Sequence, residues 1–192
     1  MSHARQVERL AEGGARFIQL REKNASPRDF YLAALEAIRV ARRLNVQVII
    51  NDRVDIAMAA GADGVHLGQD DLPPEKTRAL LGENRIIGFS THNLKQALEA
   101  NSTSVDYIAI GPVFQTSTKE KPDPVVGLDG ITEVKQSISK PLVAIGGITL
   151  ERAKSVIDAG ADSVAIISDL YSAEEISARA RRFIDSLISV SQ

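Results

Sequence analysis

Short apolar stretches recur along the chain and alternate with longer stretches of helical periodicity. Each apolar stretch is continuous rather than alternating and is rich in Val and Ile, which is typical of parallel strands covered on both faces. The stretches span residues 17–20, 46–50, 64–67, 86–89, 107–110, 141–145 and 163–167. Between them lie amphipathic segments such as 30–43, where Tyr31, Leu35 and Ile38 can share one face. This alternation predicts repeated β–α units and a parallel sheet.

A weak internal repeat supports the same interpretation. Gly61-Ala62-Asp63 and Gly160-Ala161-Asp162 both stand where a helical segment must end and turn into an apolar stretch. An open doubly wound sheet would favour a glycine-rich phosphate turn after its first strand, and that turn is absent. We therefore predict a TIM-type (β/α)8 barrel that lacks its first strand, with residues 1–192 as a single domain. A helical segment begins within a few residues of Met1, so we expect either further sequence upstream or a barrel open at one edge.

The composition narrows the class of protein. The 192 residues carry a formal net charge of −2 and 4% aromatic residues, which argues against nucleic-acid partners. Cysteine is absent, so disulfides, thiolate metal sites and a Cys nucleophile are excluded. No apolar run approaches the length of a membrane helix and no signal-peptide core follows Met1. We expect a cytoplasmic protein with small-molecule partners and no membrane partner, and a homo-oligomer is compatible with the sequence.

Cationic and acidic side chains stand at the ends of the predicted strands. In a barrel these ends meet at one mouth. Arg21 and Lys23, together with Lys119, could hold a multiply charged anion such as a diphosphate, or they could pair with acids on a solvated rim. Asp52 and either Asp70 or Asp71 end neighbouring units and could hold Mg²⁺. The alternative for Asp71 is a helix cap, because a helical segment follows it.

Two glycines and two histidines complete the candidate chemistry. Gly146-Gly147 lies between a strand and a helix that Thr149 can cap, which suits a phosphate, although the glycines could simply form the turn. Ser168 follows the next strand. His66 lies within an apolar stretch and is interpreted as a packed, hydrogen-bonded core residue, and His92 could contact a ligand or cap a helix.

Taken together and in this order, several segments of the chain resemble thiamine-phosphate synthases, from about residue 5 to residue 187. The segments are Gln19-Leu20-Arg21-Glu22-Lys23, Ile50-Asn51-Asp52-Arg53, the stretch 64–72, Gly88-Phe89-Ser90-Thr91-His92, the stretch 111–119 and Ala144-Ile145-Gly146-Gly147-Ile148. The resemblance implies a Mg²⁺-dependent reaction of hydroxymethylpyrimidine diphosphate with thiazole phosphate, which yields thiamine phosphate and diphosphate. In the mechanism that the resemblance implies, diphosphate leaves first, and the thiazole nitrogen then attacks the pyrimidine-methyl cation without the help of a general base.

The resemblance also implies a role for each site residue. It places Arg21, Lys23 and Lys119 in catalysis, as cations that neutralise the leaving diphosphate, and Asp52 and Asp71 on the metal. The substrate-binding residues that it implies are Gln19, Arg21, Lys23, Asn51, Ser90, Thr116, Thr118, Lys119, Gly147, Ile167 and Ser168. Two alternatives stay open: a thiazole tautomerase, a sister family that is similar around His92, and a non-catalytic barrel that binds phosphate ligands.

Overall fold

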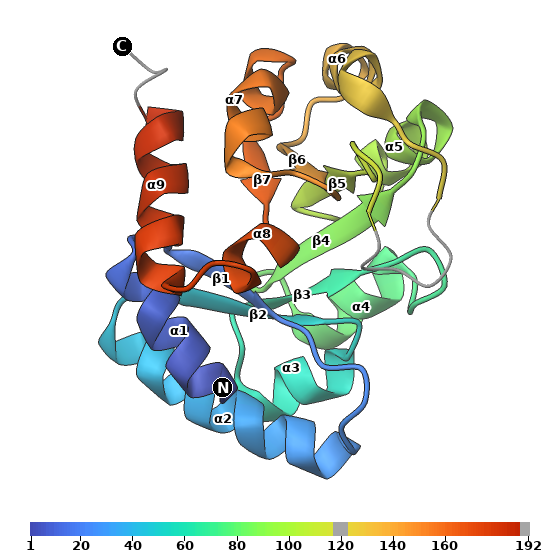
Figure 1. Ribbon diagram of the computed structural model, residues 1–192. Coiled ribbons are helices and arrows are strands. Elements are labelled where there is room, and N and C mark those ends of the chain that lie inside the picture. The colour runs from blue at the N-terminus through green and yellow to red at the C-terminus, as the bar shows by residue number, and fades with distance from the viewer. Residues whose placement is uncertain (117–122, 189–192) are drawn as a thin grey trace.

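Seven strands form one parallel sheet whose spatial order follows the chain (Figure 1). The computed structural model describes residues 1–116 and 123–188. The strands are β1 (Phe17–Leu20), β2 (Gln47–Asn51), β3 (Gly64–Leu67), β4 (Ile86–Thr91), β5 (Tyr107–Ile110), β6 (Leu142–Ile145) and β7 (Ser163–Ala165). Every pair of neighbours is parallel, and the register places His66 opposite both Asn51 and Gly88. The predicted seven-stranded parallel sheet is confirmed.

Helices alternate with these strands, and the longer ones lie on the outer side of the curled sheet (Figure 1). They are α1 (His3–Glu12), α2 (Pro27–Arg43), α3 (Val54–Ala60), α4 (Pro74–Leu81), α5 (Leu94–Asn101), α6 (Gly127–Ser137), α7 (Leu150–Asp158), α8 (Ser168–Tyr171) and α9 (Ile176–Ile188). The Ser26 hydroxyl caps α2 by accepting a hydrogen bond from the Asp29 amide at 3.1 Å. Within the described ranges, no helix combines the length and apolar character that a membrane span requires.

The two faces of the sheet pack in different ways. Buried aliphatic side chains such as Val48, Ile50 and Val65 face the helices and form the main core. On the concave face, Ile49, Tyr107 and Ala109 form a smaller cluster. Successive residues of a strand point to opposite faces, so continuous apolar strands supply both cores at once.

The sheet stays open between its edge strands, although the helices close around it. In the part of the chain that the structure describes, β1 and β7 do not pair with each other. Helix α9 packs against α1 and α7, and a side chain at Gly13 would meet the Ser177 carbonyl oxygen at 2.6 Å. Phe17 remains 45% exposed on β1. The expected barrel with an open edge is therefore confirmed for the described residues.

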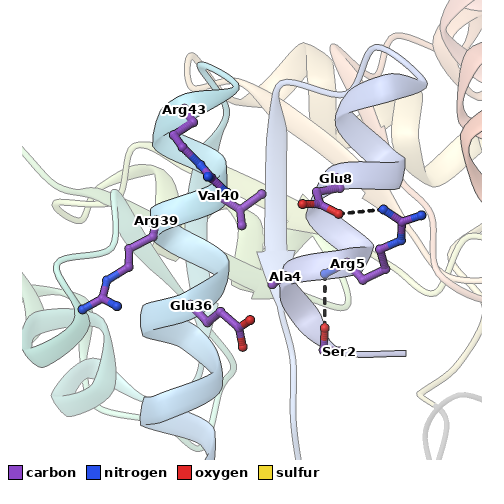
Figure 2. A pocket seen from close by; sticks show the side chains of 8 residues that line it. All are labelled: Ser2, Ala4, Arg5, Glu8, Glu36, Arg39, Val40 and Arg43. Atoms are coloured by element: carbon purple, nitrogen blue, oxygen red, sulfur yellow. Dashed lines mark hydrogen bonds and ion pairs between the residues drawn. The ribbon is translucent and has the colours of Figure 1, made fainter.

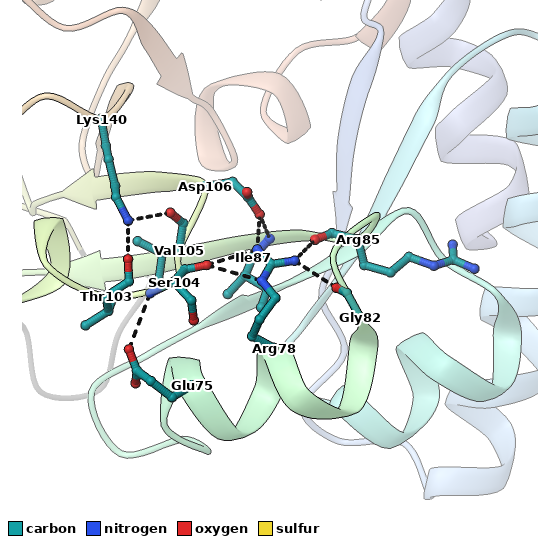
Figure 3. Close-up of polar contacts among 10 residues, drawn as sticks. All are labelled: Glu75, Arg78, Gly82, Arg85, Ile87, Thr103, Ser104, Val105, Asp106 and Lys140. Carbon is teal, nitrogen blue, oxygen red and sulfur yellow. Dashed lines mark hydrogen bonds and ion pairs between the residues drawn. The ribbon is translucent and has the colours of Figure 1, made fainter.

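A cluster of cations holds the loops at the amino ends of β4, β5 and β6 (Figure 3). Arg78 of α4 is 10% exposed in its side chain and donates to the Ser104 carbonyl at 2.9 Å and the Asp106 carboxylate at 2.6 Å. It also reaches the carbonyl oxygen of Arg85 at 2.6 Å. Lys140 donates to the Val105 carbonyl at 2.7 Å. These contacts lie at the end of the sheet opposite the predicted chemistry, so they serve stability.

Candidate active site

A cavity of about 640 Å³ opens at the carboxyl ends of the strands. It gathers, from all seven strand ends, the described residues that the sequence singled out. These lining residues are Gln19, Arg21, Lys23, Asn51, Asp52, Asp71, Ser90, Thr116, Gly147, Ile167 and Ser168. Thr118 and Lys119 lie outside the described residues, so their predicted roles are not placed by the structure. One cavity therefore collects groups that are far apart in the sequence.

Asp52 and Asp71 form a carboxylate pair on one wall of the cavity. Asp52 follows β2 with a left-handed φ of 62°, and its amide donates to the His66 carbonyl at 2.8 Å. Burial raises the pKa of the half-buried Asp52 to about 6, and the charge of the adjacent, hydrogen-bonded Asp71 acts in the same direction. Lys23 and Arg21 oppose this rise in the pKa. The pair therefore shares a proton readily when no cation is bound.

The capping alternative for Asp71 is wrong. Its Oδ2 accepts a hydrogen bond from the Gly68 amide at 2.6 Å, within its own loop. Helix α4 begins two residues after Leu72, at Pro74, and Pro73 stands at the cap position without a side-chain hydrogen bond. Proline has no backbone N–H, so at the first position of a helix it leaves one donor fewer for a capping side chain to satisfy. The Asp71 carboxylate is thereby turned toward Asp52.

The two cations of β1 face the same cavity. Neither Arg21 nor Lys23 forms an ion pair within 4.0 Å with another described residue. Pairing with acids on a solvated rim is therefore not found in the described residues. Both cations lie near enough to Asp52 to lower its pKa. Two carboxylates and two uncommitted cations together suit a ligand that combines a cation with a polyanion.

A buried polar chain forms the floor of the cavity. His66 Nδ1 lies 2.7 Å from Tyr107 Oη, and His66 Nε2 lies 2.8 Å from Ser90 Oγ. Burial lowers the pKa of His66 to about 4 and raises the pKa of Tyr107, so both groups are neutral at pH 7. His66 is buried and hydrogen-bonded as predicted, and it also lines the cavity. Tyr107 was missed because an aromatic residue at the start of an apolar stretch is typical of a core position.

His92 also lines the cavity, and it does not cap a helix. Its Nδ1 donates to the Gly111 carbonyl at 2.6 Å, and its Nε2 lies 3.5 Å from the Asp123 carboxylate. The cap of α5 is instead Asn93, whose side chain accepts from the Gln96 amide at 3.0 Å. The position of His92 fits the other predicted option, a ligand contact, which the structure itself does not test.

The loop after β6 forms the opposite wall of the cavity. Gly147 has a φ of 67°, and a side chain there would meet the Gln115 carbonyl oxygen at 2.7 Å. The Phe114 amide donates to the Gly146 carbonyl at 3.1 Å, so the loops after β5 and β6 are tied together. Thr149 stands at the cap position of α7, but its side chain makes no capping hydrogen bond. The backbone conformation and the close packing both require glycine at position 147.

A second concavity, of about 610 Å³, lies on the outside between α1 and α2 (Figure 2). Arg5 is bound to Glu8 of the same helix at 2.8 Å, and Arg39 points away from α1. None of the residues that the sequence singled out for chemistry lines this groove. The cavity at the strand ends is therefore the candidate active site.

Comparisons with known proteins bear on the family of the whole chain. The family model described as thiamine monophosphate synthase matches residues 1–170. The thiamine-phosphate synthase of Chloroflexus aurantiacus is 45% identical over 191 residues, which cover 100% of this chain and 88% of the relative. That of Koribacter versatilis is 52% identical over 164 residues, 85% of this chain and 77% of the relative.

A solved structure agrees over nearly the whole chain. The thiamine phosphate pyrophosphorylase from Pyrococcus furiosus is 35% identical with a TM-score of 0.91, and the match covers 98% of this chain and 91% of that one. Together these matches confirm the resemblance that the sequence segments indicate. The chain belongs to the thiamine monophosphate synthase family, a family of transferases.

Proposed function

We propose that this chain joins hydroxymethylpyrimidine diphosphate to thiazole phosphate, and that it does so by neutralising the departing diphosphate. The observation that carries the proposal is that Arg21 and Lys23, which form no ion pair with another described residue, lie in one cavity with the Asp52–Asp71 pair. Charge that develops on a leaving group is stabilised most strongly by groups already oriented toward it. Membership of the family supports the same reaction.

Asp52 and Asp71 are suited to hold Mg²⁺. Their close carboxylates and the raised pKa of Asp52 describe two hard oxygen donors that need a cation or a proton between them. No group of three or more His, Asp or Glu residues suited to a metal occurs among residues 1–116 and 123–188. Mg²⁺ takes one or two carboxylates and completes its coordination with water and phosphate. When bound, Mg²⁺ would supply positive charge to the phosphate oxygens.

The remaining residues would orient the substrates. Gln19 and Asn51 border the cations and would position the pyrimidine diphosphate beside Ser90. Thr116 and the backbone around Gly147, with Ile167 and Ser168, would hold the thiazole phosphate on the opposite wall, and Thr118 and Lys119 complete the predicted set. The thiazole nitrogen attacks with a lone pair and has no proton to lose. A general base is therefore not required.

The test is a purified-protein assay with both substrates and Mg²⁺, monitored for thiamine phosphate and diphosphate. Arg21→Ala should lower kcat/KM by roughly 100-fold, as expected for a lost charge-stabilising contact. Arg39→Ala is the matched control, because this exposed cation lies on the outer groove. Conversion of thiazole tautomers without condensation would instead support the sister activity. Binding of both substrates without turnover would support a ligand-binding barrel.

A further inference from the structure

The hydrogen-bonded side chains at the cavity floor restrict where the proton of the His66 ring can lie. His66, Tyr107 and Ser90 together make two hydrogen bonds, at 2.7 Å and 2.8 Å, and His66 is only 7% exposed. A neutral imidazole carries one N–H and one acceptor nitrogen. The two hydrogen bonds can therefore be donated in only two directions: from Tyr107 to His66 to Ser90, or in the reverse order. Each direction leaves a different hydroxyl proton without an acceptor.

The burial of the two hydroxyl groups distinguishes these directions. If His66 Nδ1 donated to Tyr107, the phenolic proton would be left without an acceptor among the described residues. Tyr107 is only 9% exposed, so an unused donor there would be costly. If Tyr107 donates to Nδ1, the uncommitted proton belongs to Ser90, which is more exposed and lines the cavity. A doubly protonated ring would also leave the phenolic proton unused.

A glycine in the sheet makes room for the Tyr107 side chain to reach His66. Tyr107 on β5 is in register with Gly88 on β4, which is in register with His66 on β3. A Cβ at Gly88 would lie 2.1 Å from Tyr107 Cζ and 2.3 Å from its Oη. The phenol crosses an intervening strand through a position that has no side chain. The Phe17 ring packs edge-on against Tyr107, with centroids 6.1 Å apart.

We infer that His66 is a positioning residue, held by Tyr107 as the Nε2–H tautomer, and that it makes the Ser90 hydroxyl a hydrogen-bond donor into the cavity. This inference rests on the proposed function for its ligand. Ser90 would then bind an acceptor atom of the pyrimidine diphosphate, such as an unprotonated ring nitrogen. A donor group of the ligand at that point would face the Ser90 proton and would be disfavoured.

The tautomer can be measured without any turnover. The protein has three histidines, and in ¹⁵N NMR of the purified protein the signals of His66 are the ones that are lost in His66→Gln. We expect a protonated Nε2 and an unprotonated Nδ1. An Nδ1–H tautomer or an imidazolium at pH 7.5 would overturn the inference. A failure of the proposed function would leave this readout intact, so the two failures can be distinguished.

Kinetics test the consequence for the substrate. Tyr107→Phe keeps the ring and removes only the donor to Nδ1, so KM for the pyrimidine diphosphate should rise about fivefold to tenfold while kcat changes less. Ser90→Ala should behave similarly, and the double variant should be no worse than Ser90→Ala alone. Tyr31→Phe on α2 is the matched control, with unchanged kinetics. If the rises in KM caused by Tyr107→Phe and Ser90→Ala multiply in the double variant, the two hydroxyls act independently and the inference is wrong.

Discussion

Replacing Asp52 by Asn should stabilise the metal-free protein and inactivate it at the same time. The Asp52 carboxylate is half-buried beside Asp71, and its pKa lies at about 6 instead of 3.8. At about 1.36 kcal/mol for each pKa unit, this difference corresponds to at most about 3 kcal/mol of unfolding free energy. Solvent screening of a half-buried group reduces the expected gain to about 1–2 kcal/mol. Asn is the appropriate replacement because, unlike Ala, it tolerates the left-handed φ of 62°.

The pH dependence follows from the same pKa. Because the folded protein holds the Asp52 proton more tightly than the unfolded chain, the contribution of Asp52 to wild-type stability is largest below about pH 4 and is lost as the pH rises through about 6. Asp52→Asn should lack this component of the fall. Urea unfolding in EDTA at pH 4.5 and pH 7.5 measures it, and a matched assay with Mg²⁺ should show a loss in kcat/KM of at least about 100-fold.

Asp158→Asn is the control for both measurements, because Asp158 is an exposed partner of Lys154 on α7 and lies away from the cavity. It should change stability by less than about 0.5 kcal/mol and leave kcat/KM unaltered. An Asp52→Asn variant that is less stable than wild type in EDTA at pH 7.5, or that keeps normal turnover, would refute the account of the carboxylate pair.

Three further predictions concern the metal, the phosphate wall and the opposite end of the sheet. Apparent Mg²⁺ affinity, measured calorimetrically with diphosphate present, should weaken about tenfold between pH 7 and pH 5, because Asp52 must lose its proton before it binds metal. Gly147→Ala should raise KM for thiazole phosphate about tenfold, whereas Gly82→Ala, which also has a positive φ but open space around it, should not. Arg78→Met should lower the unfolding free energy by about 2–4 kcal/mol in urea titrations, with little loss for exposed Arg39→Met.

The sheet could be predicted because most of its strands are short continuous runs of apolar residues in the sequence. The inner strands β3 and β5 are buried at every position, so apolar residues accumulate there in short continuous runs, whereas the edge strands β1 and β7 are partly exposed. The predicted stretches begin one residue early at β2 and β6, and the largest overrun, two residues, lies at the end of β7, where the chain changes direction. Ile166 and Ile167 continue the last apolar run, yet β7 ends at Ala165 because the chain turns at Ile167 into α8. Hydrophobicity alone could not place that turn.

The residues at the strand ends could be predicted for a geometric reason. Parallel strands end at the same edge, so Arg21, Asp52 and Ser90 had to approach one mouth once the sheet was assumed. The chain from Tyr107 to His66 could not be predicted, because it depends on the phenol crossing Gly88 between two strands. No local pattern records that a missing side chain on one strand admits the side chain of another.

The cavity concentrates groups that the fold alone would disfavour. Asp52 combines a left-handed φ with a raised pKa, and Arg21 faces the cavity without an ion pair among the described residues. The left-handed φ and the raised pKa of Asp52 weaken the metal-free protein, while the Arg78 cluster and the aliphatic core compensate. We expect a bound metal and a diphosphate to neutralise the acids and the cations together, so the proposed ligands would offset the charges that this cavity brings close to one another. Stabilisation and chemistry are thus separated along the strand direction, which allows the loops at the carboxyl ends to carry strained and like-charged groups without loss of the fold.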